Sequence, residues 1–299
     1  MVERRTILRA GGAALVVGAT AGVVGLETGL IPGRARVHDL VGLTGPDGVI
    51  PDVPAGPAAS GSFESFGRRT TVRYSVLYPD GYEPTDPLPV VLVLHGRGGD
   101  HTSAVRDLGI DRYLTAAVRS GTPPFALATV DGGADTYWHR RVTDEDPGFM
   151  LDQEFLPLLA KRGLDTARYG VLGWSMGGYG ALLLAALRSW QRRVRPGTRA
   201  VAVGALSPAI WRSYADAAPG AFDNQEDFDG GQLFGRRVGL QDVAVRIDCG
   251  RDDPFAEAAA DLRRELRAGG GQQAGAHTPG YWRRMLPAQL EFLGRELRN

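Results

Sequence analysis

The sequence predicts one large α/β domain, a mostly parallel and doubly wound sheet with helices on both of its faces. From residue 88 onward, apolar runs of the kind that form buried strands alternate with helical stretches, which is the pattern of such sheets. A serine between glycines joins one of these runs directly to a helical stretch. The chain has 299 residues, of which 43% are hydrophobic. That is enough for one domain of about 250 residues with a large core.

Residues 1–30 resemble a twin-arginine export signal. Arg4 and Arg5 precede an apolar run, rich in Gly and Ala, over 10–26. As a helix this run would span about 25 Å, slightly less than the roughly 30 Å hydrocarbon core of a membrane. No clean cleavage site follows it, so two outcomes stay open. We expect the protein to be exported and then either secreted or anchored through this segment to the outer face of the cytoplasmic membrane.

The chain between this segment and the domain has a different composition. Residues 31–62 are rich in Gly, Pro and Ala, which bury little surface, and they are expected to form a linker. The folded domain is therefore expected over 63–299.

Charge and cysteine content exclude several classes of partner and site. The formal net charge is zero, so no nucleic-acid partner is expected. Cys249 is the only cysteine, which excludes an internal disulfide and a multi-cysteine metal site. It lies in an apolar run and is expected in the core.

The elements of the domain follow from the hydrophobic patterning. Two alternating runs within 62–82, split by Gly67, predict a pair of strands. Continuous apolar runs predict strands within 88–100, 124–133, 168–174, 199–207 and 243–250. Helical spacing predicts helices within 104–121, 146–163, 176–190, 255–269 and 282–298. Right-handed crossovers then place the C-terminal ends of the parallel strands along one rim, where open α/β sheets bind ligands.

Ser175 stands at the tightest of these junctions. The strand predicted to end at Gly173 and the helix predicted from Met176 leave almost no chain between them, so the serine is expected in a strained conformation. Gly173 and Gly177 remove Cβ atoms that would collide there. A Gly-x-Ser-x-Gly turn between a strand and a helix is the nucleophile elbow, which holds the hydroxyl above the sheet rim. We therefore predict a nucleophile, the alternative being an ordinary N-cap serine.

A serine hydroxyl needs a base, usually histidine, to take its proton. The chain has five histidines, and His277 is the only one that follows Ser175. In this kind of fold the base comes last in the chain order, so we predict His277, with a surface-loop residue as the alternative. His95 is interpreted as structural and His101 as a surface residue, while His139 is a candidate for lining the site.

The acid that orients the base is expected just after the strand within 243–250. We predict Asp253, with Asp252 as the alternative, and we expect Asp248 to lie within the strand.

Attack on a carbonyl creates an oxyanion, which needs preorganised N–H donors. The backbone N–H groups of Met176, directly after the nucleophile, and Arg97, in the glycine-rich loop after an earlier strand, are the predicted donors. The alternative for that loop is a plain tight turn between strand and helix.

Six stretches together resemble the esterase D and antigen 85 family of α/β-hydrolases, over roughly residues 65–297. They are LVLHGRGGD, DTYWHRR, MLDQEFLPLL, GWSMGGYGALLLA, DCGRDDPF and GAHTPGYWRRMLPAQLEFL. The resemblance implies the α/β-hydrolase fold and a Ser-Asp-His esterase with no metal and no organic cofactor. Carried over to the matching positions, the triad is Ser175, Asp253 and His277.

From these observations we expect an exported serine carboxylesterase that acts on a small-molecule or lipid ester through an acyl-enzyme on Ser175. The elbow, GWSMGGYG, is similar to the esterase D type. An acyltransferase of the antigen 85 type, which would move the acyl group to a sugar or lipid hydroxyl, is the first alternative. A catalytically inactive, surface-anchored binding protein is the second.

The segment over 207–237 is too long for a plain crossover between two strands and is expected to cover the site. Its aromatic residues Trp211 and Phe222, together with His139 from an earlier loop, are the candidates for a substrate pocket. The alternative is that these aromatic side chains only pack the segment onto its own domain.

Overall fold

The computed structural model of the protein describes residues 42–187 and 198–298. The chain divides into two compact units, Met1–Gly45 and Pro46–Asn299, and every described helix and strand lies in the second. The predicted export signal at 1–30 lies outside the described residues, as does 31–41 of the predicted linker. Among the described helices, none has both the length and the apolar character that a membrane crossing requires.

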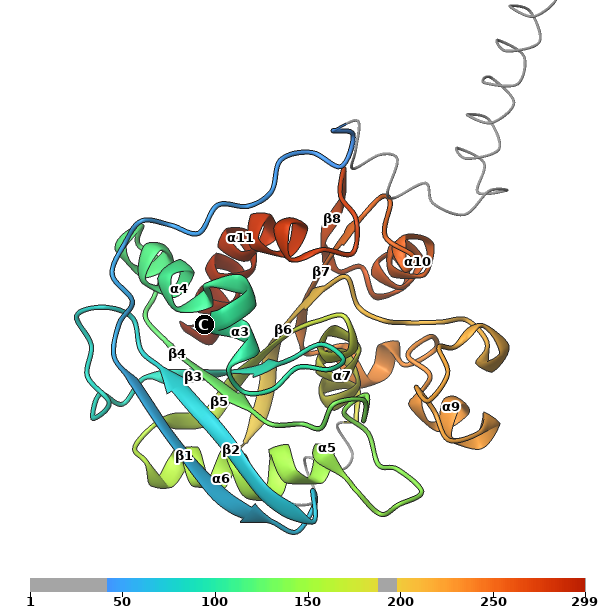
Figure 1. Cartoon of the computed structure of the whole chain (residues 1–299), viewed down its shortest axis with the longest axis horizontal. Helices are drawn as coiled ribbons and strands as arrows, with labels where there is room; N and C mark the ends of the chain where they lie inside the picture. Colours follow the sequence, from blue (N-terminus) through green and yellow to red (C-terminus); the bar gives the residue numbers. More distant parts are fainter. Residues whose placement is uncertain (1–41, 188–197, 299) are drawn as a thin grey trace, which may run out of the picture. The chain divides into compact units, whose positions relative to one another are not determined.

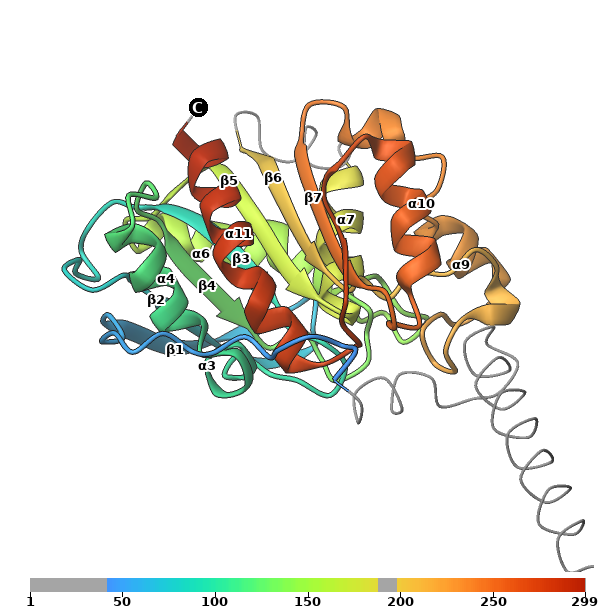
Figure 2. The same cartoon turned by 90° about the horizontal axis from the view of Figure 1, so that it is seen from above.

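The second unit is built on an eight-stranded sheet with the order β1-β2-β4-β3-β5-β6-β7-β8 (Figures 1 and 2). The pairs β1–β2 and β2–β4 are antiparallel and all the other pairs are parallel, which confirms the predicted mostly parallel sheet. The strands are β1 Ala58–Ser65, β2 Thr70–Leu77, β3 Pro89–Leu94, β4 Ala126–Val130, β5 Asp165–Trp174, β6 Arg199–Leu206, β7 Ala244–Gly250 and β8 Gly269–Gln273.

Helices cover both faces of this sheet, and each layer closes its own hydrophobic core. One layer holds α3 Ser103–Leu108, α4 Ile110–Arg119 and α11 Pro279–Arg298. The other holds α6 Leu156–Lys161, α7 Met176–Ala186 and α10 Ala256–Leu266. The shorter elements are α5 Pro147–Phe149, η1 Met150–Phe155, η2 Tyr214–Asp216, α9 Gln225–Gly231 and η3 Arg237–Leu240.

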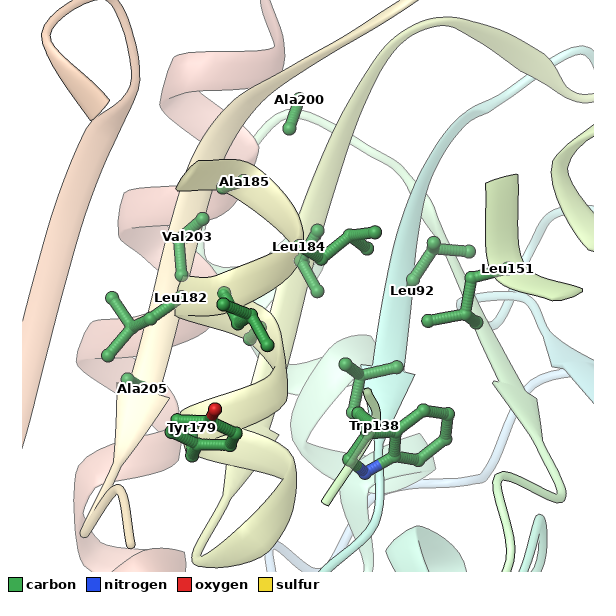
Figure 3. Packing of buried hydrophobic residues seen from close by; sticks show 14 of the residues in the cluster. Leu92, Trp138, Leu151, Tyr179, Leu182, Leu184, Ala185, Ala200, Val203 and Ala205 are labelled. Atoms are coloured by element: carbon green, nitrogen blue, oxygen red, sulfur yellow. The ribbon is translucent and has the colours of Figure 1, made fainter. Parts of the chain in front are cut away.

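Helix α7 is buried along its whole length, because small and aliphatic residues surround its axis on every side. Leu182, Leu184 and Ala185 belong to one core cluster with the sheet residue Val203, and Tyr179 lies nearer the start of the helix (Figure 3). A helix that is apolar all round belongs in a core. The element that follows Ser175 is therefore held by packing on all sides.

Two predicted helices are interrupted, each for a local reason. The stretch 104–121 forms α3 and α4, because Gly109 adopts a left-handed φ of 65° between them. The stretch 146–163 forms α5, the wider π-helix η1 and α6. Pro157, near the start of α6, lacks the N–H that a regular α-helix would bond to the carbonyl four residues earlier.

The domain begins earlier than the sequence predicted. Residues 46–57, part of the predicted linker, lie against the domain: the Gly48 N–H donates to the Gly280 carbonyl at 2.8 Å, and the Tyr113 hydroxyl donates to the Val49 carbonyl at 2.8 Å. Residues 58–62 belong to β1. A Gly- and Pro-rich composition does not prevent docking where partners on the domain satisfy the backbone groups.

Candidate active site

The junction at Ser175 has the geometry of the predicted elbow. Ser175 has φ 55° and ψ −122°, a region that residues with a side chain rarely occupy. A Cβ on Gly173 would lie 2.1 Å from the Gly177 carbonyl oxygen, and one on Gly177 would lie 1.9 Å from the Leu94 carbonyl oxygen. Both positions therefore exclude any larger residue.

Hydrogen bonds hold the strained residue in place. The Ser175 N–H donates to the Leu206 carbonyl at 2.9 Å, and the Ala209 N–H donates to the Ser175 carbonyl at 3.0 Å. Strain of this kind costs on the order of 1–3 kcal/mol and persists only where the surroundings determine the conformation. Here the neighbouring strand and the chain after it supply that constraint.

Three side chains from distant parts of the sequence meet above this junction. His277 Nε2 lies 2.9 Å from Ser175 Oγ, and His277 Nδ1 lies 2.8 Å from Asp253 Oδ2. A carboxylate only accepts, so Nδ1 donates and Nε2 is left to accept the serine proton. The Asp253 side chain is fully buried and also accepts the Phe255 N–H at 2.9 Å. The structure thus brings together Ser175, His277 and Asp253, the three residues that the sequence singled out.

The other two aspartates of this region have different partners. Asp248 lies inside β7, as expected, and its carboxylate accepts from Arg246 at 2.7 Å and from Gln289 at 2.9 Å. Asp252 lies in the loop after β7, where its N–H donates to the Gly275 carbonyl at 2.8 Å. The carboxylate that meets His277 is that of Asp253.

Two aromatic rings, which the sequence analysis did not single out, restrict the base. Phe255 and Trp282 lie 5.3 and 5.0 Å from the His277 ring, with interplanar angles of 67° and 90°. They limit rotation of the imidazole while its side chain stays 26% exposed. Both lie in the motifs around the acid and the base, and their aromatic character was the only sequence signal for a contact with His277.

The two predicted oxyanion donors lie beside the elbow. Met176 is the first residue of α7, and Arg97 follows Gly96, where an added Cβ would lie 3.5 Å from Ser175 Cβ. Within the described part of the chain, neither N–H donates to another backbone group. Both N–H groups therefore lie beside the elbow without a backbone acceptor, as the predicted oxyanion donors require.

The chain between β6 and β7, residues 207–243, contains the candidate pocket residues. Trp211 is partly buried and lies 5.3 Å from Phe255, which in turn touches His277. The other two candidates, His139 and Phe222, stack on each other at 5.2 Å and are both buried. Of the three, only Trp211 meets Phe255 directly; Phe222 meets Trp211 at 6.1 Å and so lies one ring further from the base.

His101 and Cys249 are the remaining residues whose burial the sequence predicted. His101, expected at the surface, is largely covered because its Nδ1 pairs with Asp131 at 2.8 Å. Cys249 is buried as expected, and burial together with the charge of Asp253 raises the pKa of its thiol. Over 42–187 and 198–298, no group of three or more His, Cys, Asp or Glu side chains is placed to hold a metal ion.

Comparison with known proteins gives a family and a fold. A family model described as "Putative esterase" matches residues 64–293. No curated protein sequence matches significantly. A ferulic acid esterase structure has a TM-score of 0.67 at 19% identity and covers 80% of this chain and 98% of its own.

Two structures from Staphylococcus aureus have the same fold. A fluorophosphonate-binding serine hydrolase has a TM-score of 0.65 at 16% identity and covers 81% of this chain and 99% of its own. An S-formylglutathione hydrolase has a TM-score of 0.62 at 16% identity and covers 80% and 98%. The fold predicted from the resemblance, that of the α/β-hydrolases, is confirmed.

Proposed function

The chain belongs to the "Putative esterase" family, and from that premise we propose that it is an exported serine carboxylesterase that hydrolyses carboxylic esters through an acyl-enzyme on Ser175. One observation carries the proposal. Hydrogen bonds of 2.9 and 2.8 Å connect Ser175 through His277 to the buried carboxylate of Asp253. This arrangement turns a weak hydroxyl nucleophile into a reactive one.

In the acylation step, Ser175 Oγ attacks the ester carbonyl carbon and His277 Nε2 takes the hydroxyl proton. The N–H groups of Met176 and Arg97 donate to the resulting oxyanion. The intermediate collapses, the C–O bond to the alcohol breaks, and the proton moves from His277 to the leaving oxygen. Asp253 stabilises the transient imidazolium, while the acyl group stays on Ser175.

Deacylation repeats these steps with water. His277 takes a proton from the attacking water and returns it to Ser175 Oγ as the acid leaves. An acyltransferase would differ only here, because an alcohol would replace water. Product partition therefore separates the two activities: with a dilute alcohol acceptor we expect free acid, and predominant transfer would contradict the hydrolase assignment.

The experiment that tests the proposal is a panel of activated esters of graded acyl length, with kcat/KM measured for the wild type and for Ser175→Ala. We expect the wild type to hydrolyse part of the panel and to bind one equivalent of an organophosphonate, and we expect Ser175→Ala to do neither. Ser60→Ala, at an exposed serine on β1, is the matched control and should keep both properties. A folded wild type that is inert in both assays would indicate a binding protein instead.

Export rests on the paired arginines of the N-terminal segment. Changing Arg4 and Arg5 to Lys is expected to retain the protein in the cytoplasm, because twin-arginine signals are read through both residues. Arg9→Lys, in the same segment, is the control. Subcellular fractionation gives the readout, and equal export of all three forms would contradict the proposal.

A further inference from the structure

We infer that His95 is a positioning residue for the oxyanion hole, because its imidazole holds the peptide unit between Gly96 and Arg97 and so directs the Arg97 N–H toward the substrate oxygen. This inference rests on the proposed function and deepens it. The sequence alone predicts only a structural role for His95, which precedes a glycine-rich turn.

One peptide unit connects His95 to the predicted oxyanion donor. His95 Nδ1 lies 2.8 Å from the Gly96 carbonyl oxygen. That carbonyl and the Arg97 N–H belong to the same planar unit, and the described chain has no cis peptide bonds. In a trans unit the two groups point in opposite directions. A donor that holds the carbonyl therefore also sets the direction of the N–H, next to Ser175.

The hydrogen-bond partners of the His95 imidazole fix its tautomer. His95 Nε2 lies 3.0 Å from the Gly132 backbone nitrogen, which can only donate, so Nε2 accepts. The partner of Nδ1 is a carbonyl, which can only accept, so Nδ1 donates. These two partners select the neutral ring with its proton on Nδ1. Burial lowers the pKa of His95 and favours the same neutral form.

The loop after β4, which contacts His95, is itself held by further hydrogen bonds. The Gly132 carbonyl accepts from Arg68 at 2.9 Å and from the Thr136 hydroxyl at 2.7 Å. The Trp138 indole N–H donates to the His95 carbonyl at 3.2 Å, and the two rings lie 5.0 Å apart. The loop after β4 thus holds His95 from both sides. Figure 3 shows Trp138 in the packed layer beside α7.

A second donor to the Gly96 carbonyl limits the loss of activity expected when His95 is replaced. The Gly96 carbonyl also accepts the Gly99 N–H at 3.1 Å, so it would keep one donor without His95. Complete removal of an oxyanion donor costs about 10²–10³ in kcat. Loss of the His95 contact should misdirect the Arg97 N–H without removing it, so we expect a smaller loss, of about ten- to thirtyfold.

Two amide substitutions separate the two contacts of the ring. In His95→Asn the amide nitrogen can take the place of Nδ1 and still donate to Gly96, whereas in His95→Gln the amide reaches toward Gly132. We expect kcat to fall about threefold in His95→Asn and at least tenfold in His95→Gln, each with KM within about twofold, because the oxyanion forms only in the transition state. His101→Gln, six residues along, is the matched control and should keep kcat within about twofold.

A trifluoromethyl ketone, which forms an oxyanion on Ser175, gives a second readout. Its affinity should fall in parallel with kcat across the variants. Equal losses in His95→Asn and His95→Gln, or wild-type kcat in both, would overturn the inference while the esterase assignment stood. A wild type inert toward esters and organophosphonate would overturn the proposed function and this inference with it.

A measurement on the wild type covers the case in which both variants fail to fold. Long-range ¹H–¹⁵N correlation spectra report the tautomer of each histidine. We expect His95 to carry its proton on Nδ1 at neutral pH. A proton on Nε2 would overturn the inference, because Nδ1 could then not donate to Gly96.

Discussion

The chain leaves β5 and β6 at the same rim of the sheet in two opposite ways. After β5 it turns on the single residue Ser175, in a strained conformation, with Gly173 and Gly177 pressed against backbone oxygens. After β6 it runs through residues 207–243, in short helices and turns, before β7 begins. This difference indicates that the reaction depends on the turn at Ser175, where the surrounding backbone allows only one conformation. We expect the choice of substrate to depend on the segment 207–243, where replaceable side chains pack on one another.

The contacts of the segment 207–243 support that division. Phe222 and Phe228 meet edge to face at 5.0 Å, and Tyr214 packs on Phe228 at 6.2 Å. Polar contacts to the rest of the domain include the Tyr179 hydroxyl, which donates to the Gly231 carbonyl at 2.9 Å. Side chains in such a cluster can change size at a moderate cost, since aromatic packing tolerates more than a backbone collision does.

The largest expected effect is at Asp253, the acid that orients His277 beside the strained junction. Asp253→Asn should lower kcat about 10⁴-fold, because the amide can donate to His277 Nδ1 and would then favour the tautomer whose Nε2 cannot accept the serine proton. Steady-state kinetics on one ester measure this loss. Asp252→Asn, the neighbouring residue, should stay within about threefold of the wild type. If the larger loss fell on Asp252→Asn, the assignment of the acid would be wrong.

Two glycine substitutions, one in each region, test the difference between the regions through the free energy of unfolding. Gly177→Ala places a Cβ 1.9 Å from the Leu94 carbonyl oxygen, so the free energy of unfolding should fall by about 3 kcal/mol or more. Gly230→Ala, in α9, meets nothing within 4 Å and should be neutral or stabilise by up to about 1 kcal/mol. Urea denaturation of both variants measures the difference. Similar losses of unfolding free energy in the two variants would contradict the proposed difference between the two regions.

The difference between the two regions also explains which parts of the fold and the site could be predicted from the sequence. Ser175 was predictable because two glycines, an apolar run and a helix mark the junction locally, and His277 followed from chain order. Strand β8 was missed because its residues, Gly269–Gln273, carry no β pattern and pair only with β7 at the edge of the sheet. The docking of residues 46–57 and the contact of Trp282 with His277 depend on partners far away in the sequence, which no local pattern reveals.

A smaller effect, on the preference for acyl length, is expected in the segment 207–243. Trp211 and Phe222 help to line a void of only about 10 Å³, and the Trp211 ring also touches Phe255 beside His277. Trp211→Ala should enlarge this space and raise the kcat/KM ratio of long to short acyl esters about tenfold. The ester panel measures the ratio. Tyr214→Ala, in the same segment, should leave it within about twofold, and an unchanged ratio in Trp211→Ala would place the acyl group elsewhere.

The smallest expected effect is the pH dependence of stability at His95. Burial lowers the pKa of His95 from its ordinary value of 6.5, with Arg68 acting in the same direction and the Gly96 carbonyl, Asp131 and Asp100 opposing it. Well above pH 6.5 the ring is neutral in both the folded and the unfolded chain and contributes no pH dependence. Below it, the unfolded chain takes up a proton that the folded chain resists, so the free energy of unfolding falls, by at most about 1.4 kcal/mol per pH unit.

The range between pH 5 and 7 isolates this effect from the nearby carboxylates. Burial alone would raise the pKa of Asp100, but hydrogen bonds from Thr102 and the charge of Arg106 hold it at about 2. Its stabilising charge is therefore lost only below pH 4. Urea denaturation of the wild type and of His95→Asn should give a steeper decline for the wild type as the pH falls. Parallel curves would mean that His95 takes up its proton in the folded chain as readily as in the unfolded one, which its donor at Gly132 and its burial oppose.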